Sequence, residues 1–310
     1  MFSFSEIKIF WRLSPQVYLL PMEPVIRDIS DTSLWVAVYR ADETDRPDAV
    51  FKDPYARRLA GERGEQIVQA MASGRKNSWS LVARTWLFDQ FVMQHVKDGY
   101  DLILNLASGL DARAFRLDLP PELRWIDADL PGIVSYMNEM MKDEVPRCKH
   151  ERVAIDLADR NARLEFFKQV STKGKKILVV TEGLVVYLPA EEAGAFAFDL
   201  SHTPGFKRWV IDMLSPPILP MIREEMGTLL EDAKSPLVFA PEEGEDFFRL
   251  FGWTPIDIKS RLKTAAALKR LSLQMKIFAA MPEPKGPVRK FPWAGVCLFE
   301  NSARQDSFAG

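Results

Sequence analysis

The chain has 310 residues, of which 47% are hydrophobic and 27% are charged, so it can bury a large core. This composition excludes disordered and fibrous proteins. A formal net charge of −2 gives no general attraction to nucleic acid or to anionic membranes, so neither is expected as a partner.

The first 21 residues look like a targeting segment but fail the tests for one. Lys8, Arg12 and Pro15 interrupt the apolar stretch, which is shorter than the roughly 20 uninterrupted apolar residues that span a bilayer. Residues 1–21 are therefore predicted to be an extension, neither signal nor anchor. Residues 22–98 carry apolar side chains at helical spacing and are predicted to form an N-terminal helical cap.

From Tyr100 the pattern changes to short apolar runs separated by helical segments, which is typical of a parallel sheet with crossover helices. We expect residues 99–310 to form one α/β core. A segment over 215–238 follows the fifth run and is predicted to be either a lid over the ligand crevice or a plain structural insertion. Seven strands are expected in one mostly parallel sheet, at residues 101–107, 124–130, 151–157, 176–188, 208–214, 255–260 and 295–301.

Polar residues follow the first three predicted strands, where open α/β sheets bind their ligands. Gly109 permits a tight turn after the first strand. Asp129 comes 20 residues later, the separation at which an acid meets ribose hydroxyls, so a nucleoside site is predicted. Asp156 can accept from an adenine amino group, and Leu157 can lie on the base.

The fourth predicted strand ends at Glu182, at the mouth of the same crevice. Next to the glycine turn, Asp111, Arg113 and Arg116 are interpreted as a helix cap with ion pairs rather than as ligand contacts.

Five sequence blocks resemble the leucine carboxyl methyltransferase superfamily, which includes polyketide O-methyltransferases. The blocks are RPDAVFKDPYARRLAG, SLVARTWLFDQF, LNLASGLDARAFRL, WIDADLP and TEGLVVYLP, in this order. The resemblance covers roughly residues 36 to 190. It implies a class I, Rossmann-like methyltransferase fold and S-adenosylmethionine as the cofactor.

The resemblance also implies roles for single residues. Arg84 would hold the methionine carboxylate, and Glu182 would face the amino-acid end of the cofactor. Tyr187 would approach the methyl-transfer region. The remaining implied contacts are the turn under the methionine moiety (Ala107, Ser108 and Gly109), the ribose acid (Asp129) and the pair that frames the adenine (Asp156 and Leu157). Ala107 or Ser108 stands where such turns often have a further glycine, so the approach to the cofactor is narrower.

The residue inventory agrees with this cofactor, which presents one carboxylate, an ammonium, a ribose diol and an adenine. Arg84 can pair with the carboxylate in bidentate fashion, while Glu182, Asp129 and Asp156 provide separate acceptors. No metal is expected. Neither Cys148 nor Cys297 has metal-ligand spacing, and both are interpreted as buried apolar residues in a reducing cytoplasm.

The three histidines bear on the acceptor. His95, His150 and His202 precede predicted strands and should lie at the edge opposite the crevice, so no imidazole would act as a base. A carboxylate is already ionised at neutral pH, which favours methylation of a small-molecule carboxylate. A hydroxyl acceptor stays open, with Asp212 or a residue of the N-terminal helices as the base.

Two other classes share part of the pattern. A nicotinamide-dependent oxidoreductase needs a G-x-G-x-x-G turn for its pyrophosphate, and NLASGLDA lacks that turn. The altered glycine turn also permits an inactive cofactor-binding protein. The sequence does not identify the acceptor or the oligomeric state.

Overall fold

The computed structural model describes residues 32–71, 74–226, 237–283 and 290–303. The predicted extension over residues 1–21 lies outside the described residues. The described helices are α1 (Thr32–Thr44), α2 (Ala56–Ala70), α3 (Ser78–Lys97), α4 (Arg113–Arg116), α5 (Pro131–Met140), α6 (Arg160–Ser171), α7 (Ala190–Ser201), α8 (Leu219–Met226), α10 (Arg261–Ala267) and α11 (Leu273–Ala280), with short 3-10 turns η2 (Gly74–Asn77), η3 (Val185–Tyr187), η4 (Pro216–Ile218) and η5 (Gly244–Phe251).

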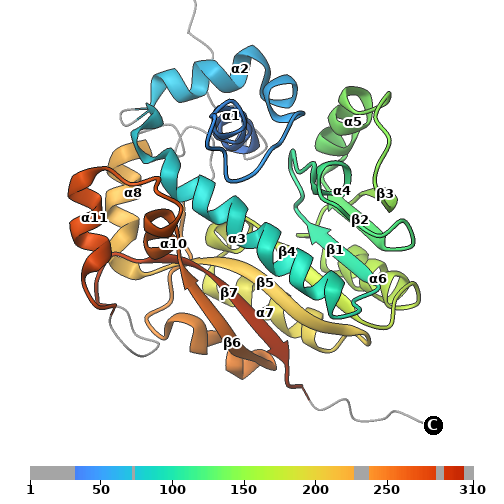
Figure 1. Cartoon of the computed structure of the whole chain (residues 1–310). Coiled ribbons are helices and arrows are strands. Elements are labelled where there is room, and N and C mark those ends of the chain that lie inside the picture. Colours follow the sequence, from blue (N-terminus) through green and yellow to red (C-terminus); the bar gives the residue numbers. More distant parts are fainter. Residues whose placement is uncertain (1–31, 72–73, 227–236, 284–289, 304–310) are drawn as a thin grey trace, which may run out of the picture.

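One seven-stranded sheet forms the centre of the molecule, as predicted (Figure 1). Its order is β3-β2-β1-β4-β5-β7-β6, and only β7 runs antiparallel to its neighbours β5 and β6. The strands are β1 (Leu102–Leu106), β2 (Arg124–Asp129), β3 (Lys149–Ala154), β4 (Ile177–Thr181), β5 (Phe206–Leu214), β6 (Trp253–Ser260) and β7 (Ala294–Asn301).

Two predicted strand ends differ from the structure. β3 stops at Ala154, so Asp156 and Leu157 lie in the following loop. β4 stops at Thr181, and the apolar residues after Gly183 form the turn η3 rather than more strand. In each case the chain leaves the sheet at the carboxyl end of the strand. The loops after β3 and β4 therefore lie at the same edge of the sheet.

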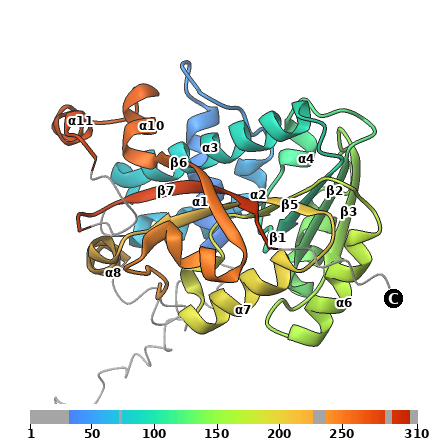
Figure 2. The ribbon, with the colours of Figure 1, turned by 90° about the horizontal axis from the view of Figure 1, so that it is seen from below.

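Helices cover both faces of the sheet and create two cores (Figure 2). Side chains alternate across a strand, so Ile103 of β1 joins one core while Leu102 and Leu104 join the other. The first core lies under α1, α2 and α3, and the second lies under α6, α7 and η5. Because both faces are covered, the central strands are apolar throughout.

The N-terminal helices pack against each other and against the sheet. A Cβ on Gly64 of α2 would lie 3.0 Å from the Leu34 carbonyl oxygen, so glycine allows α1 and α2 to approach closely. The 20-residue helix α3 crosses the sheet beside β5 and β7. Helix α1 is thereby held over the carboxyl ends of the strands. The division at residue 98 between cap and core remains a prediction.

The described part of the segment after β5 does not line the main cavity, which fits the plain structural insertion better than the lid. Ile218, Leu219, Ile222 and Leu237 pack against the first core, and none of them lines the main cavity. Apolar side chains that find a core at this place have no reason to cover the crevice. Residues 227–236 of this segment lie outside the described residues. Among the described helices, none is long and apolar enough to cross a membrane.

Candidate active site

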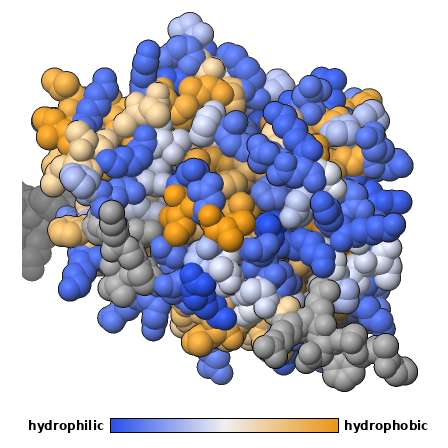
Figure 3. Space-filling view, turned by 60° about the horizontal axis from the view of Figure 1, so that its bottom comes forward, coloured by the Kyte–Doolittle hydropathy of each residue, from blue (hydrophilic) through white to orange (hydrophobic). Residues whose placement is uncertain are grey.

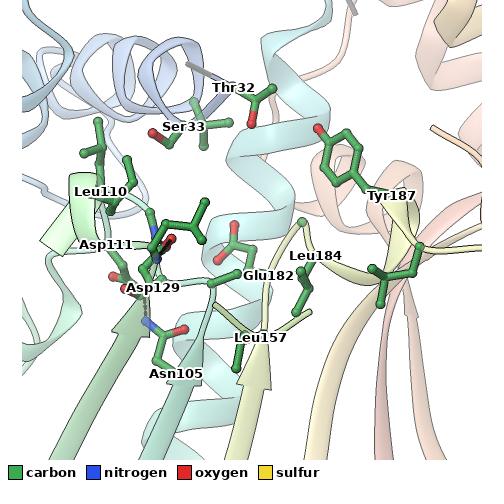
Figure 4. A pocket seen from close by; sticks show the side chains of 18 of the residues that line it. Thr32, Ser33, Asn105, Leu110, Asp111, Asp129, Leu157, Glu182, Leu184 and Tyr187 are labelled. Carbon is green, nitrogen blue, oxygen red and sulfur yellow. Dashed lines mark hydrogen bonds between the residues drawn. The ribbon is translucent and has the colours of Figure 1, made fainter. Parts of the chain in front are cut away.

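A cavity of about 600 Å³ opens at the carboxyl edge of the sheet, beneath α1 (Figure 4). Its walls come from α1, α3, the loops after β1 to β4, and α7. The structure brings all nine predicted site residues to this one cavity: Arg84, Ala107, Ser108, Gly109, Asp129, Asp156, Leu157, Glu182 and Tyr187. Arg84 and Tyr187 are distant in sequence but line the same cavity, because α3 passes the carboxyl edge of the sheet where the strands end.

The turn after β1 is tight and has two residues in the left-handed region. Ala107 has φ 51° and Gly109 has φ 53°. A Cβ on Gly109 would lie 3.1 Å from the Cβ of Ser33, so α1 rests directly on this turn. Gly109 is therefore required by both conformation and space, whereas Ala107 carries backbone strain that a glycine would not.

Asp129 ends β2 and fixes the same turn. Its Oδ2 accepts a hydrogen bond from the Gly109 backbone N–H at 2.6 Å, and its Oδ1 accepts from that of Leu130 at 2.7 Å. Burial raises the pKa of this carboxyl group, and the two N–H groups oppose that change. Asp156 is exposed at the rim, where its Oδ1 accepts from the Ala158 N–H at 2.9 Å.

Two arginines neutralise Glu182. Its Oε1 accepts from Arg84 Nε at 2.9 Å, and its Oε2 lies 2.8 Å from Arg113 Nη2. Burial by itself would raise the pKa of Glu182, but the guanidinium groups of Arg113 and Arg84 together lower it to about 2. Glu182 is therefore a fixed anion at neutral pH. Gly183 leaves room for this pair, since a Cβ there would lie 3.4 Å from Arg84 Nη1.

Helix α1 contributes a cavity wall that the sequence reasoning did not assign residue by residue. One face of this helix lines the cavity, and its residues are Thr32, Ser33, Val36 and Arg40. Their helical spacing in the sequence was the signal for this wall. The Tyr187 hydroxyl hydrogen-bonds to Thr32, and Figure 4 shows the two hydroxyl groups turned toward each other at the cavity wall. Burial raises the pKa of Tyr187, so its phenol is neutral.

The ion-pair cluster beside the glycine turn contains Asp111, Arg113 and Arg116, and two of these residues line the cavity, which was not predicted. Arg113 pairs with Asp89 and Asp111, and Arg116 pairs with Asp89, as the ion-pair interpretation expected. Arg113 and Asp111 also line the cavity, as does Asn105 of β1. A polar residue within the apolar strand LILNL was the signal for Asn105.

Comparison with known proteins identifies the family. The model of a family described as leucine carboxyl methyltransferase matches residues 33–197, more than half of the chain. The chain belongs to the leucine carboxyl methyltransferase family.

Relatives within the curated proteins agree. A protein from Mycobacteroides abscessus is 27% identical over 280 residues, which cover 79% of this chain and 89% of the relative. One from Rhodococcus jostii is 34% identical over 202 residues, which cover 62% of this chain and 64% of the relative. Both names describe S-adenosyl-L-methionine-dependent methyltransferases.

Solved structures show the same fold. A DUF574 family protein from Streptomyces avermitilis has a TM-score of 0.56 at 12% identity and covers 86% of this chain and 96% of its own. A methyltransferase from Thermobifida fusca has a TM-score of 0.55 at 14% identity and covers 93% of this chain and 100% of its own. The class I methyltransferase fold and the S-adenosylmethionine cofactor predicted above are confirmed, and the nicotinamide alternative is set aside.

The donor set of this leucine carboxyl methyltransferase family member fits its cofactor. The turn of Gly109 gives the close approach that the methionine chain needs, and buried acceptors lie at Asp129 and Glu182. The individual roles of these residues remain predictions. Among the described residues no group of three or more His, Cys, Asp or Glu side chains is arranged to hold a metal ion.

Asp212 does not occupy the position of a free base. It lies within β5, two residues before the strand ends, and is not part of the cavity wall. Its carboxylate accepts from the Gly183 N–H at 2.7 Å, from Arg84 Nη1 at 3.2 Å and from Arg261 Nη2. Because its carboxylate is held by these donors and does not reach the cavity, the suggested role of Asp212 as a base is corrected to a structural one.

The histidines lie away from the cavity in this structure. His95 Nδ1 bonds the Phe91 carbonyl at 2.7 Å, and His150 Nε2 lies 2.7 Å from Asp127 Oδ2. His202 stacks on Phe198 at the end of α7. None of the three is part of the cavity wall.

Proposed function

We propose that this methyltransferase transfers its methyl group to a carboxylate oxygen of a small molecule. The observation that carries the proposal is that no histidine lines the cavity within the described part of the chain, and that two of its acids, Glu182 and Asp129, are already engaged by other groups. Glu182 has a pKa of about 2, and Asp129 is occupied by two backbone N–H groups. An acceptor carboxylate with a pKa near 4 arrives ionised and needs no base. The family is described as leucine carboxyl methyltransferase, and the carboxyl group in that description supports the same choice.

The chain would act mainly by binding and orientation. S-adenosylmethionine, when bound, supplies an electrophilic methyl group. Tyr187 offers a neutral hydroxyl that can donate a hydrogen bond to an acceptor oxygen. The apolar side chains of Trp35, Val36, Leu81 and Leu184 line the cavity and exclude water. Alignment and dehydration of the acceptor are the contributions expected from such a site.

A hydroxyl acceptor is the second candidate, and Glu192 of α7 favours it. This exposed carboxylate lines the cavity, and no hydrogen bond or ion pair to another described residue holds it. A carboxylate without other partners at the cavity wall is free to accept a proton from a bound phenol. Replacement of Glu192 by Gln would abolish transfer to a hydroxyl and leave transfer to a carboxylate intact.

Product chemistry tests the proposal. The enzyme is incubated with methyl-labelled S-adenosylmethionine and paired acceptors that differ only in bearing a carboxylate or a phenol. We expect label in a product that mild alkali hydrolyses to methanol, because esters are labile and ethers are not. A product stable to alkali assigns hydroxyl methylation instead. Cofactor binding without turnover on either acceptor class would favour the inactive alternative.

A further inference from the structure

Asn105 is a buried amide that the proposed reaction does not use. It lies in β1, is 2% exposed and is part of the cavity wall. In an otherwise apolar strand such a side chain costs stability unless its polar atoms find partners. The directions of its amide nitrogen and oxygen therefore show which hydrogen-bond partner a ligand in the cavity must supply.

Two carboxylates fix the orientation of this amide. Asn105 Nδ2 donates to Asp127 Oδ1 at 2.9 Å and to Asp111 Oδ2 at 3.0 Å. Because the Asn105 nitrogen donates to both carboxyl groups, the amide oxygen faces away from them. Figure 4 shows the amide nitrogen directed at Asp111 and the oxygen turned toward the Glu182 side of the cavity.

The two carboxylates are themselves held in place. Asp127 accepts from Trp125 Nε1 at 2.8 Å and contacts His150 Nε2 at 2.7 Å. Asp111 accepts from the backbone N–H of Arg113 at 2.8 Å and from its Nη1 at 2.6 Å. A flip of the Asn105 amide would place its oxygen against the oxygen atoms of both carboxyl groups and lose two hydrogen bonds, so the oxygen stays directed into the cavity.

The oxygen of Asn105 has no donor among the described residues, although the side chain is almost wholly buried. It lies at the same end of the cavity as Glu182, because Arg113 bridges the two sides: its Nη1 bonds Asp111 and its Nη2 bonds Glu182. The neutral acceptor Asn105 Oδ1 and the Glu182 carboxylate thus lie at the end of the cavity where the amino-acid end of the cofactor is expected.

We propose that Asn105 Oδ1 accepts a hydrogen bond from the α-ammonium group of the cofactor's methionine moiety, beside Glu182. An ammonium has three N–H donors and no acceptor, so a single carboxylate leaves donors unsatisfied. The oriented amide supplies a second acceptor without adding negative charge to a site that already holds Asp111 and Asp127. The site then selects ligands with an amino group at this position.

A binding cycle tests the proposal by calorimetry. The ligands are S-adenosylhomocysteine and its analogue in which hydrogen replaces the α-amino group; the proteins are the wild type and Asn105→Leu. We expect the variant to raise the Kd of S-adenosylhomocysteine about tenfold or more, since a hydrogen bond to a charged group is lost. The Kd of the deaminated analogue should be almost unchanged. Equal losses for both ligands would overturn the proposal.

A control variant and a measurement on wild-type protein complete the test. Asp156→Asn at the adenine end should weaken both ligands by the same factor. Because Asn105→Leu removes the donor to two buried acids and this loss weakens the fold, asparagine-labelled wild-type protein provides an independent readout by NMR. The chain has five asparagines, which keeps the spectrum simple. The Asn105 carbonyl resonance should shift with S-adenosylhomocysteine and not with the analogue, and identical responses would contradict the contact.

Discussion

The carboxylate of Asp129 and the backbone N–H of Gly109 are joined by a 2.6 Å hydrogen bond that links the end of β2 to the turn after β1. The predicted ribose acid therefore also shapes the turn. Asp129→Ala should weaken S-adenosylhomocysteine binding by roughly 1–3 kcal/mol, measured by calorimetry, while the fold survives. Asp129→Asn, which keeps one acceptor oxygen, should lose less. An unchanged Kd for the alanine variant would place the ribose elsewhere.

Glu182 should make the protein sensitive to acid. Its folded pKa of about 2 lies below the ordinary value of 4.5, so its ion pairs stabilise the fold above pH 4.5 and are lost as the pH falls toward 2. The difference of 2.5 pH units corresponds to roughly 3 kcal/mol. Urea unfolding of wild type and Glu182→Gln from pH 7 to pH 2 measures this. The two free energies of unfolding should converge at low pH, and a constant difference would contradict the assignment.

Ala107 is strained at φ 51°, so Ala107→Gly should stabilise the protein. Relief of about 1–2 kcal/mol outweighs the roughly 0.5–1 kcal/mol that glycine costs by its freedom in the unfolded chain. Thermal unfolding should show a higher Tm. The matched control is Ala266→Gly in the helix α10, where the φ angle suits alanine and the Tm should fall. A fall in both variants would mean that the methyl group of Ala107 makes packing contacts that exceed the strain.

Tyr187 should act on transfer more than on cofactor affinity. Tyr187→Phe removes the hydroxyl that meets Thr32, and kcat should drop about 3- to 10-fold, the effect of one neutral hydrogen bond. The Kd for S-adenosylhomocysteine should stay the same. Thr32→Val breaks the same contact but keeps the phenol, so it should retain more activity. Equal losses in the two variants would assign Tyr187 to holding α1 instead.

The rate of methyl transfer should be independent of pH from about 6 to about 8 if the acceptor is a carboxylate. His95, His150 and His202 lie outside the cavity wall, and burial raises the pKa of Tyr187 above this window. Initial rates under saturating acceptor measure the profile. A tenfold rise per pH unit would show that a proton must leave the acceptor or a base, as in hydroxyl methylation.

The sequence by itself determined the α/β class and most of the candidate site. Apolar runs bounded by helices predict strands from local pattern, and Asp129, Asp156 and Glu182 follow such runs. Because parallel strands end at one edge, the sequence predicts that residues distant along the chain share one crevice. The predicted ends of β3 and β4 were too late because an apolar loop residue such as Leu157 looks the same as a strand residue.

Only the tertiary structure decided which partners each group has. The insertion of β7 between β5 and β6 is a pairing across the chain that local pattern does not contain. The same is true of Arg261, which reaches Asp212 from α10 and gives that carboxylate a structural partner. The orientation of Asn105 depends on two acids that folding brings to its nitrogen. Charge, hydrogen bonding and burial act through space, so the chemistry of a site is settled only when its neighbours are placed.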